Sequence, residues 1–494
     1  MTADGQADGL PEPSSWVRLE WLSLTFSPKK ANFFSQWTSL YKAQLDLNRH
    51  HELAERLSSL HSTGPVSSTK SKTDFINYIA IKLVSPHLNR PPHDTLTEIK
   101  TLSSLDHPNI VPLLDHWEPP QHGNYCLFLP LYPLTLYDLL NIQTKPFHPS
   151  GYAGFEALTR RIVRGIAAGL GYLHDRSLAH RDINPSNVAL TEQGHPVLID
   201  FGTVWPGHPS PEADSLEFEL GTISNKSLNR LITSPPSSPL SFSFVHRPYR
   251  APELLFGSRS YSPFALDIWS FGALIAEFYT PMERSQDASF SLYSDPPEEP
   301  SLNHPGSWSG TAMDWYACGD LADPSATAPI GPLVRKTLFE GSIGDIGLVG
   351  SIFKILGTPD STTWPEAKRL PDFSKLNFHA FPKQDLRGYL PTLSYTLELA
   401  EQRLLAAQEP EASQLKDQIT VERQKIKEKV LLIERFLSFQ STARIDAFRK
   451  AFFPQPPHSG EVDQDSSWLW RHVEDENQIC SDAIDAFFLA ESEP

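Results

Sequence analysis

Two short polar runs, thirteen positions apart, constrain what this chain can be. Residues 180–187 read His-Arg-Asp-Ile-Asn-Pro-Ser-Asn, and Asp200-Phe201-Gly202 comes later. Carboxylate and carboxamide oxygens are the kind of ligand that Mg²⁺ takes in proteins. A carboxylate can also position and deprotonate a hydroxyl that attacks a phosphoryl group. In these two runs Asp182 fits the role of such a base, and Asn187 and Asp200 fit the role of metal ligands.

Four further motifs occur in a fixed order around these runs. Tyr78-Ile79-Ala80-Ile81-Lys82 is typical of a short apolar strand that ends in a lysine. Glu98 lies in a helical stretch over residues 94–100, where it could pair with Lys82. Tyr249-Arg250-Ala251-Pro252-Glu253 and Asp267-Ile268-Trp269-Ser270-Phe271-Gly272 follow in the second half of the chain. A single lysine at a strand end would be unremarkable, but the ordered set is specific.

This ordered set resembles the signature of eukaryotic serine/threonine protein kinases. The resemblance implies an α+β, bilobal kinase fold with a small β-rich lobe and a larger helical lobe. It also implies that ATP and Mg²⁺ bind between the lobes and that the substrate is a protein. In such a site Asp182 is the base, and Asn187 and Asp200 bind Mg²⁺. Lys82, paired with Glu98, binds the α- and β-phosphates.

The same resemblance assigns the contacts of the nucleotide base. Three small or branched side chains would touch the adenine: Val66, Ala80 and Ala189. The backbone of Leu131 would supply hinge hydrogen bonds, and Leu129 would border the back of the pocket.

Later stretches narrow the resemblance to the group of cyclin-dependent and MAP kinases. They are residues 249–257 (YRAPELLFG), 261–272 (YSPFALDIWSFG) and 336–365, the last with Leu-Gly-Thr-Pro at 356–359. Arg444 matches the late arginine that pairs with the glutamate of the Ala-Pro-Glu motif, here Glu253.

The chain departs from this pattern at the glycine-rich loop that covers the ATP phosphates. No glycine occurs between Pro11 and Thr63, and the best frame, Ser59 to Val66, keeps only Gly64 and Val66. Side chains at the other positions restrict φ and hold the backbone away from phosphate. Cyclin-dependent-type kinases without this loop are similar to the monomeric CDK-activating kinases of fungi. That resemblance implies a cyclin-dependent kinase as substrate.

A second departure is Asn184, which stands where these kinases usually have a lysine that touches the transferring phosphate. An asparagine can donate a hydrogen bond but carries no charge. Losing one donor to a developing charge typically costs about 10²–10³ in rate. We expect Asn184 to stand in partly for the lysine and the enzyme to be slow. The alternative is a catalytically silent scaffold that uses the kinase fold to hold a partner.

Two features bear on regulation. The stretch His93 to Glu98 keeps little besides the glutamate of the cyclin-binding helix of cyclin-dependent kinases, so we expect a monomer that needs no cyclin. Residues 223–246 interrupt matching flanks in the activation segment, either as a lineage-specific loop or as a retained intron. With them removed, Glu217 falls where the activating threonine of those kinases lies, and its carboxylate could replace a phosphate on Arg181.

The remaining sequence sets the predicted organisation. Residues 1–51 are expected to be a disordered tail followed by a helix over about 27–47, where Phe33, Trp37, Leu40 and Tyr41 recur at helical spacing. The helix would pack on the small lobe or dock a partner. Residues 52–132 would form the small lobe and hinge, and 133–453 the large lobe. Insertions are expected near 205–246, 283–330 and 398–429, the last a solvated helix or helical pair, and 454–494 would be an acidic tail.

The amino-acid composition bears on which partners the protein can bind and in which cell compartment it works. The net charge of −17 argues against a dominant surface for nucleic acid or anionic membrane, because phosphate groups attract basic fields. Three scattered cysteines are too few for a disulfide framework, which favours the cytoplasm or nucleus. No segment reaches the roughly 18 apolar residues of a membrane span.

Overall fold

The computed structural model describes residues 34–35, 38–44, 57, 78–85, 93–117, 124–141, 146–207, 247–258, 261–284, 333–453, 480 and 484. The small lobe holds β1 (Phe34–Ser35), β2 (Thr38–Gln44), β3 (Tyr78–Val84), α2 (Thr95–Ser104), β4 (Asp115–Trp117) and β5 (Tyr125–Pro130). The large lobe begins with β6 (Leu134–Thr135), α3 (Leu136–Leu140), α4 (Phe155–His174), β7 (Leu178–Ala179), the 3₁₀ helix η3 (Pro185–Asn187), β8 (Val188–Leu190), β9 (Pro196–Leu198) and β10 (Trp205–Pro206). It continues with η5 (Arg247–Tyr249), α6 (Pro252–Leu255), α7 (Pro263–Glu277), β11 (Met282–Arg284), β12 (Leu333–Arg335), α8 (Gly344–Leu356), α9 (Tyr395–Ala406), α10 (Glu411–Phe436) and α11 (Ser441–Phe452), with 3₁₀ turns between residues 365 and 394.

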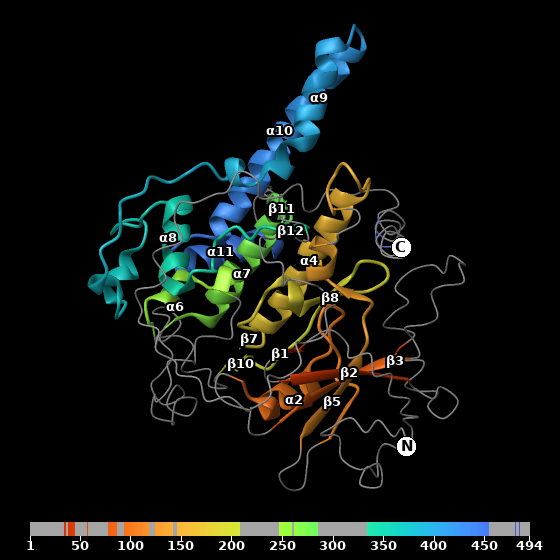
Figure 1. Cartoon of the computed structure of the whole chain (residues 1–494), viewed down its shortest axis with the longest axis vertical. Helices are drawn as coiled ribbons and strands as arrows, with labels where there is room; N and C mark the ends of the chain where they lie inside the picture. Colours follow the sequence, from red (N-terminus) through yellow and green to blue (C-terminus); the bar gives the residue numbers. More distant parts are fainter. Residues whose placement is uncertain are drawn as a thin grey trace, which may run out of the picture.

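The small lobe is a five-stranded antiparallel sheet in the order β1-β2-β3-β5-β4, with α2 beside it (Figure 1). β3 has the sequence YIAIKLV, and its aromatic and β-branched residues favour an extended chain buried in a sheet. α2 begins where Asp94 accepts a hydrogen bond from the backbone N–H of Thr97, which is a standard N-cap. The lysine strand and the glutamate helix are therefore where the sequence predicted them.

The predicted helix over residues 27–47 is wrong. The described residues of this range form the paired strands β1 and β2, and all seven residues of β2 pair with β3, from Thr38 opposite Val84 to Gln44 opposite Tyr78. Leu40 lies opposite Lys82 and packs against the core. The apolar spacing was compatible with a helix, but the edge of β3 offers unpaired backbone groups, and the hydrogen bonds of a full strand pairing satisfy them. The small lobe therefore begins by Phe34 rather than at residue 52.

The large lobe is built around α4 and α7, which cross its interior and bury apolar side chains on most sides. α7 buries 14 of its 15 residues, including Trp269 and Phe271, and α10 and α11 pack against it. The short strands β6, β8 and β9 form a separate sheet on the side that faces the small lobe (Figure 1). This arrangement is the two-lobed α+β kinase fold that the sequence predicted.

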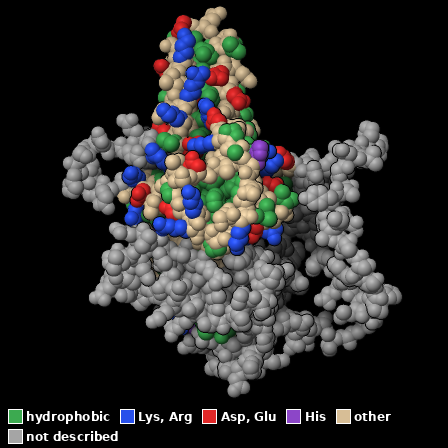
Figure 2. Space-filling model, turned by 90° about the vertical axis from the view of Figure 1, so that its left-hand side faces the viewer, with side chains coloured by type: hydrophobic (Ala, Val, Ile, Leu, Met, Phe, Trp, Pro, Cys, Tyr) green, Lys and Arg blue, Asp and Glu red, His purple; other side chains and the backbone are tan. Residues whose placement is uncertain are grey.

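The predicted helical pair over residues 398–429 is present. α9 and α10 lie side by side and project from the large lobe (Figure 1), and Figure 2 shows charged side chains of both signs over the projection. Arg423 on α10 donates to Glu401 on α9 at 2.7 Å. At the base, the Lys429 ammonium lies 2.6 Å from Glu156 of α4 and fixes the pair to the large lobe.

The segment predicted as a second insertion leaves and re-enters the fold at one place. β11 and β12 are antiparallel, and Arg284 lies directly opposite Leu333. Arg335 is buried beside them, and its guanidinium donates to the carbonyls of Leu140, Phe147, Phe278 and Thr280.

The segment predicted as an acidic tail contributes at least two core residues. Cys480 and Ile484 are fully buried, and Ile484 lies beside Gly194 and Leu158. No helix in the ranges given above is long and apolar enough to cross a membrane.

Candidate active site

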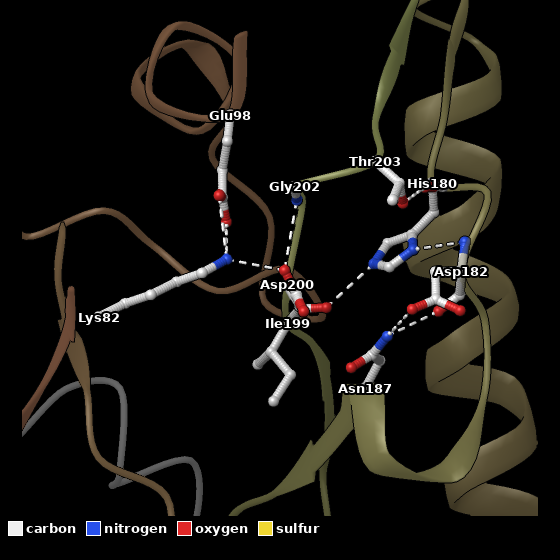
Figure 3. A network of polar contacts seen from close by, with 9 residues as sticks. All are labelled: Lys82, Glu98, His180, Asp182, Asn187, Ile199, Asp200, Gly202 and Thr203. Carbon is white, nitrogen blue, oxygen red and sulfur yellow. Dashed lines mark hydrogen bonds and ion pairs between the residues drawn. The ribbon is translucent and has the colours of Figure 1, made fainter. Parts of the chain in front are cut away.

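The small-lobe half of the site is an ion-pair network around Lys82 (Figure 3). Its Nζ lies 2.7 Å from Oε1 of Glu98 on α2 and 2.7 Å from Oδ1 of Asp200, which follows β9. Burial opposes every charge here, but the Lys82 ammonium holds the pKa of Asp200 well below its usual range. The two carboxylates in turn raise the pKa of Lys82 above its usual value despite the burial. The site therefore keeps one ammonium and the Asp200 carboxylate ionised at neutral pH.

α2 is fixed at its N-terminal end to the loop of Asp200 and Gly202. The backbone N–H of Asp94 donates to the carbonyl of Gly202 at 3.0 Å. Gly202 leaves room for this approach, because a Cβ there would lie 3.2 Å from both His93 and Asp200. Seven residues after α2, the backbone N–H of Val111 donates to the carbonyl of Leu198 on β9. These contacts hold Glu98 in reach of Lys82.

The large-lobe half of the site is the loop from His180 to Asn187. His180 is buried, and its Nδ1 lies 3.3 Å from the backbone N–H of Asp182, which can only donate. Its Nε2 therefore carries the proton and donates to the carbonyl of Ile199 at 3.0 Å. Burial lowers the pKa of His180, in keeping with a neutral ring. The ring joins the loop of Asp182 to Ile199, the residue before Asp200 (Figure 3).

The carboxylate of Asp182 is held by two asparagine amides. Nδ2 of Asn187 donates to Oδ2 at 2.7 Å, and Nδ2 of Asn184 donates to Oδ1 at 3.1 Å. With its nitrogen turned to Asp182, Asn187 keeps its carbonyl oxygen for another partner. That oxygen and the Asp200 carboxylate are hard oxygen donors from two adjacent strand ends, and this donor set fits Mg²⁺.

The residues assigned to the adenine are divided between described and undescribed parts of the chain. Ala80 and Leu129 lie directly opposite one another in β3 and β5, and both are on the same face as Lys82. Ala189 is buried on β8, and Leu131 is half-buried just after β5. Val66 lies outside the described residues, in the connection between β2 and β3.

Sequence reasoning missed the hairpin that precedes the lysine strand. The connection between β1 and β2 is Gln36-Trp37, so the frame placed on residues 59–66 falls after this hairpin rather than within it. Leu40, on the face of Lys82, is an additional candidate for contact with the nucleotide base. The residues of β2, TSLYKAQ, do not alternate apolar with polar side chains, so the sequence carries no clear strand signal here.

The pair predicted from the Ala-Pro-Glu motif is formed. Arg444 of α11 is fully buried and donates from Nη2 to Oε1 of Glu253 at 2.6 Å. Arg181 donates from Nε to the carbonyl of Thr203 at 2.7 Å, which places it at the start of the activation segment. Glu217 lies outside the described residues.

Comparisons with known proteins agree with this site. A family model described as protein kinase domain matches residues 62–293. The chain is 27% identical over 323 residues to serine/threonine-protein kinase csk1 of Schizosaccharomyces pombe, which covers 64% of this chain and 77% of that protein. It is 24% identical to cyclin-dependent kinase 11 of Dictyostelium discoideum over 76% of this chain and 79% of that protein.

It is also 26% identical to cyclin-dependent kinase F-3 of Oryza sativa subsp. japonica over 60% of this chain, and there it spans about half of the relative's length, 47%. The ordered site and these relatives together identify the enzyme as a protein serine/threonine kinase.

Proposed function

We propose that the protein is a CDK-activating kinase, which transfers the γ-phosphoryl group of ATP to a threonine or serine in the activation loop of a cyclin-dependent kinase. The observation that carries the catalytic part is the assembled set of Lys82, Glu98 and Asp200 facing Asp182 and Asn187. Kinase chemistry needs the lysine–glutamate pair and the metal-binding aspartate in place at the same time.

ATP and Mg²⁺ are the proposed cofactors. Asn187 and Asp200 would hold the metal, which neutralises charge on the phosphates when it is bound. Lys82, kept cationic by its two carboxylate neighbours, would bind the α- and β-phosphates. Asp182 would accept the hydroxyl proton of the substrate, since both of its oxygens are held in fixed directions by the asparagine amides.

The proposed substrate rests on the resemblance to fungal CDK-activating kinases and on the form of the small lobe. The two residues between β1 and β2, Gln36 and Trp37, include no glycine, in keeping with the kinases of that type that lack the glycine-rich loop. Two of the relatives named above are cyclin-dependent kinases by name, which supports the wider group.

We further propose that the enzyme acts as a monomer and needs no cyclin. The hydrogen bond from Asp94 to Gly202 and the ion pair from Glu98 to Lys82 hold α2 through contacts within this chain. A partner that pushes α2 into place would then add little, because the helix is already in the position that the ion pair requires. The small number of cysteines favours the cytoplasm or nucleus as the compartment.

The substrate proposal is tested with an unphosphorylated, catalytically inactive cyclin-dependent kinase. The purified protein, ATP and Mg²⁺ are incubated with this target, and the modified residue is located by mass spectrometry. Transfer to the activation-loop threonine is expected from the wild-type protein and not from Asp182→Asn. Transfer to a generic substrate but not to this threonine would remove the CDK assignment. Binding of ATP and Mg²⁺ without any Asp182-dependent transfer would instead indicate the scaffold.

A further inference from the structure

Asn184 uses both ends of its amide inside the catalytic loop. Its Oδ1 accepts a hydrogen bond from the backbone N–H of Ser186 at 3.0 Å, which caps η3. Because that backbone group can only donate, the orientation of the amide is fixed, and Nδ2 must point the other way. Nδ2 donates to Oδ1 of Asp182 at 3.1 Å and to the carbonyl of Asp182 at 3.3 Å. The side chain is only 1% exposed.

This geometry differs from the expectation that Asn184 stands in for a phosphate-binding lysine. An amide nitrogen has two hydrogens, and both have acceptors on Asp182. The side chain is also short and almost completely buried, so little of it is accessible to a substrate. Asn184 therefore has no donor to offer to a transferring phosphoryl group.

We propose that Asn184 is a positioning residue, which acts on phosphoryl transfer only through Asp182. Oδ1 of the carboxylate accepts a hydrogen bond from Asn184 and Oδ2 accepts one from Asn187, so an amide restrains each of its two oxygens. The base must lie within hydrogen-bonding distance of the substrate hydroxyl, so phosphoryl transfer slows when the carboxylate is free to rotate. This inference rests on the proposed kinase activity and adds how its base is oriented. It also implies that no positive charge at position 184 replaces that of the lysine usual in these kinases.

A double-mutant cycle separates action through Asp182 from direct contact with phosphate. Single-turnover transfer to a generic protein substrate is measured for the wild-type protein, Asn184→Ala, Asp182→Ala and the double variant. We expect Asn184→Ala to slow transfer about tenfold or more, with an unchanged ATP concentration for the half-maximal rate. In the Asp182→Ala background the same substitution should change the rate less than about twofold. An equal loss in both backgrounds would overturn the proposal, because it would show a direct role. Asn377→Ala, an exposed asparagine in the large lobe, is the matched control and should leave the rate unchanged.

A second measurement does not depend on activity. In protein labelled with ¹⁵N-asparagine, the side-chain NH₂ signals of Asn184 are assigned by their loss in Asn184→Ala. Removal of the acceptor in Asp182→Ala should move these signals, and unmoved signals would contradict the hydrogen bond. If the protein transfers phosphate to no substrate, the proposed function is wrong. The NH₂ signals would still show whether Asn184 donates a hydrogen bond to Asp182.

Discussion

Oδ1 of Asp267 accepts a hydrogen bond from the backbone N–H of Arg181 at 2.7 Å, where the φ of Arg181 is +67°. For a residue with a Cβ, this left-handed backbone conformation costs about 1–2 kcal/mol. The other oxygen of Asp267 accepts from the backbone N–H of His180 at 2.9 Å. One fully buried carboxylate on α7 therefore holds the strained turn that presents Asp182.

Asp267→Asn is expected to lower both stability and activity. The amide group would turn one NH₂ toward a backbone N–H, leaving a buried donor without an acceptor at a cost of about 1–3 kcal/mol. Release of the turn should also reduce kcat by at least about tenfold, since Asp182 loses its support. Chemical denaturation and steady-state kinetics would measure the two effects. Asp446→Asn, exposed on α11, is the control, and equal behaviour of the two variants would refute the role of Asp267.

The segment between β11 and β12 is expected to be dispensable for folding. Arg284 and Leu333 are directly opposite in an antiparallel pair, so a two-residue Asn-Gly turn can join them in place of residues 285–332. We expect the shortening to change the free energy of unfolding by less than about 1 kcal/mol. A change of 1 kcal/mol in a large domain shifts Tm by about 2–4 °C, so the melting temperature should stay within about 2 °C. Calorimetry would test this. A loss of cooperative unfolding would show that the segment contributes to the core.

Stability should depend on pH through Glu277. Burial raises its pKa to about 7, from an ordinary value near 4.5, and its carboxyl group contacts the hydroxyl of Tyr249. Between these two values the folded state binds a proton that the unfolded state does not, so the free energy of unfolding falls as pH rises from about 4.5 to about 7. The loss is at most about 3 kcal/mol. Glu277→Gln removes this contribution.

The melting temperature of Glu277→Gln relative to the wild-type protein should therefore increase from pH 5 to pH 8. The comparison is internal, since every other titrating group is shared by the two proteins. A difference that stays constant across this range would show that Glu277 is ionised throughout.

Activity is expected to survive treatment with phosphatase. Arg181 is half-buried and already donates to the carbonyl of Thr203, so its loop is partly ordered by contacts within the protein. When residues 223–246 are left out, Glu217 falls where the activating threonine of cyclin-dependent kinases lies, and a carboxylate is charged at neutral pH. Glu217→Ala should then lose much of the activity in a radiolabel transfer assay. If phosphatase abolishes activity and Glu217→Ala does not, an added phosphate is the activating group.

The sequence predicted those parts of the fold whose chemistry is local. The strand that carries Lys82, the helix of Glu98 and the helical pair α9–α10 each have a clear local signal, and all three are present. The pair of Arg444 and Glu253, 191 residues apart, was accessible only through the resemblance to kinases.

The parts that the sequence did not predict depend on tertiary partners. The β1–β2 hairpin has too few strand signals of its own, and its pairing with β3 decides its conformation. The orientation of the Asn184 amide depends on the backbone N–H of Ser186, which only the folded loop brings within reach. Neither relationship leaves a pattern in the residue order.

The most direct test of the central claim is phosphoryl transfer by the purified protein alone. The wild-type protein and Asp182→Asn are shown to be monomeric by light scattering, then given ATP, Mg²⁺ and a cyclin-dependent kinase without any cyclin. We predict transfer by the wild-type monomer, with a loss of at least about 10² in rate for Asp182→Asn. A silent wild-type monomer that becomes active when a cyclin is added would contradict the preassembled site, and equal rates for the two proteins would contradict Asp182 as the base.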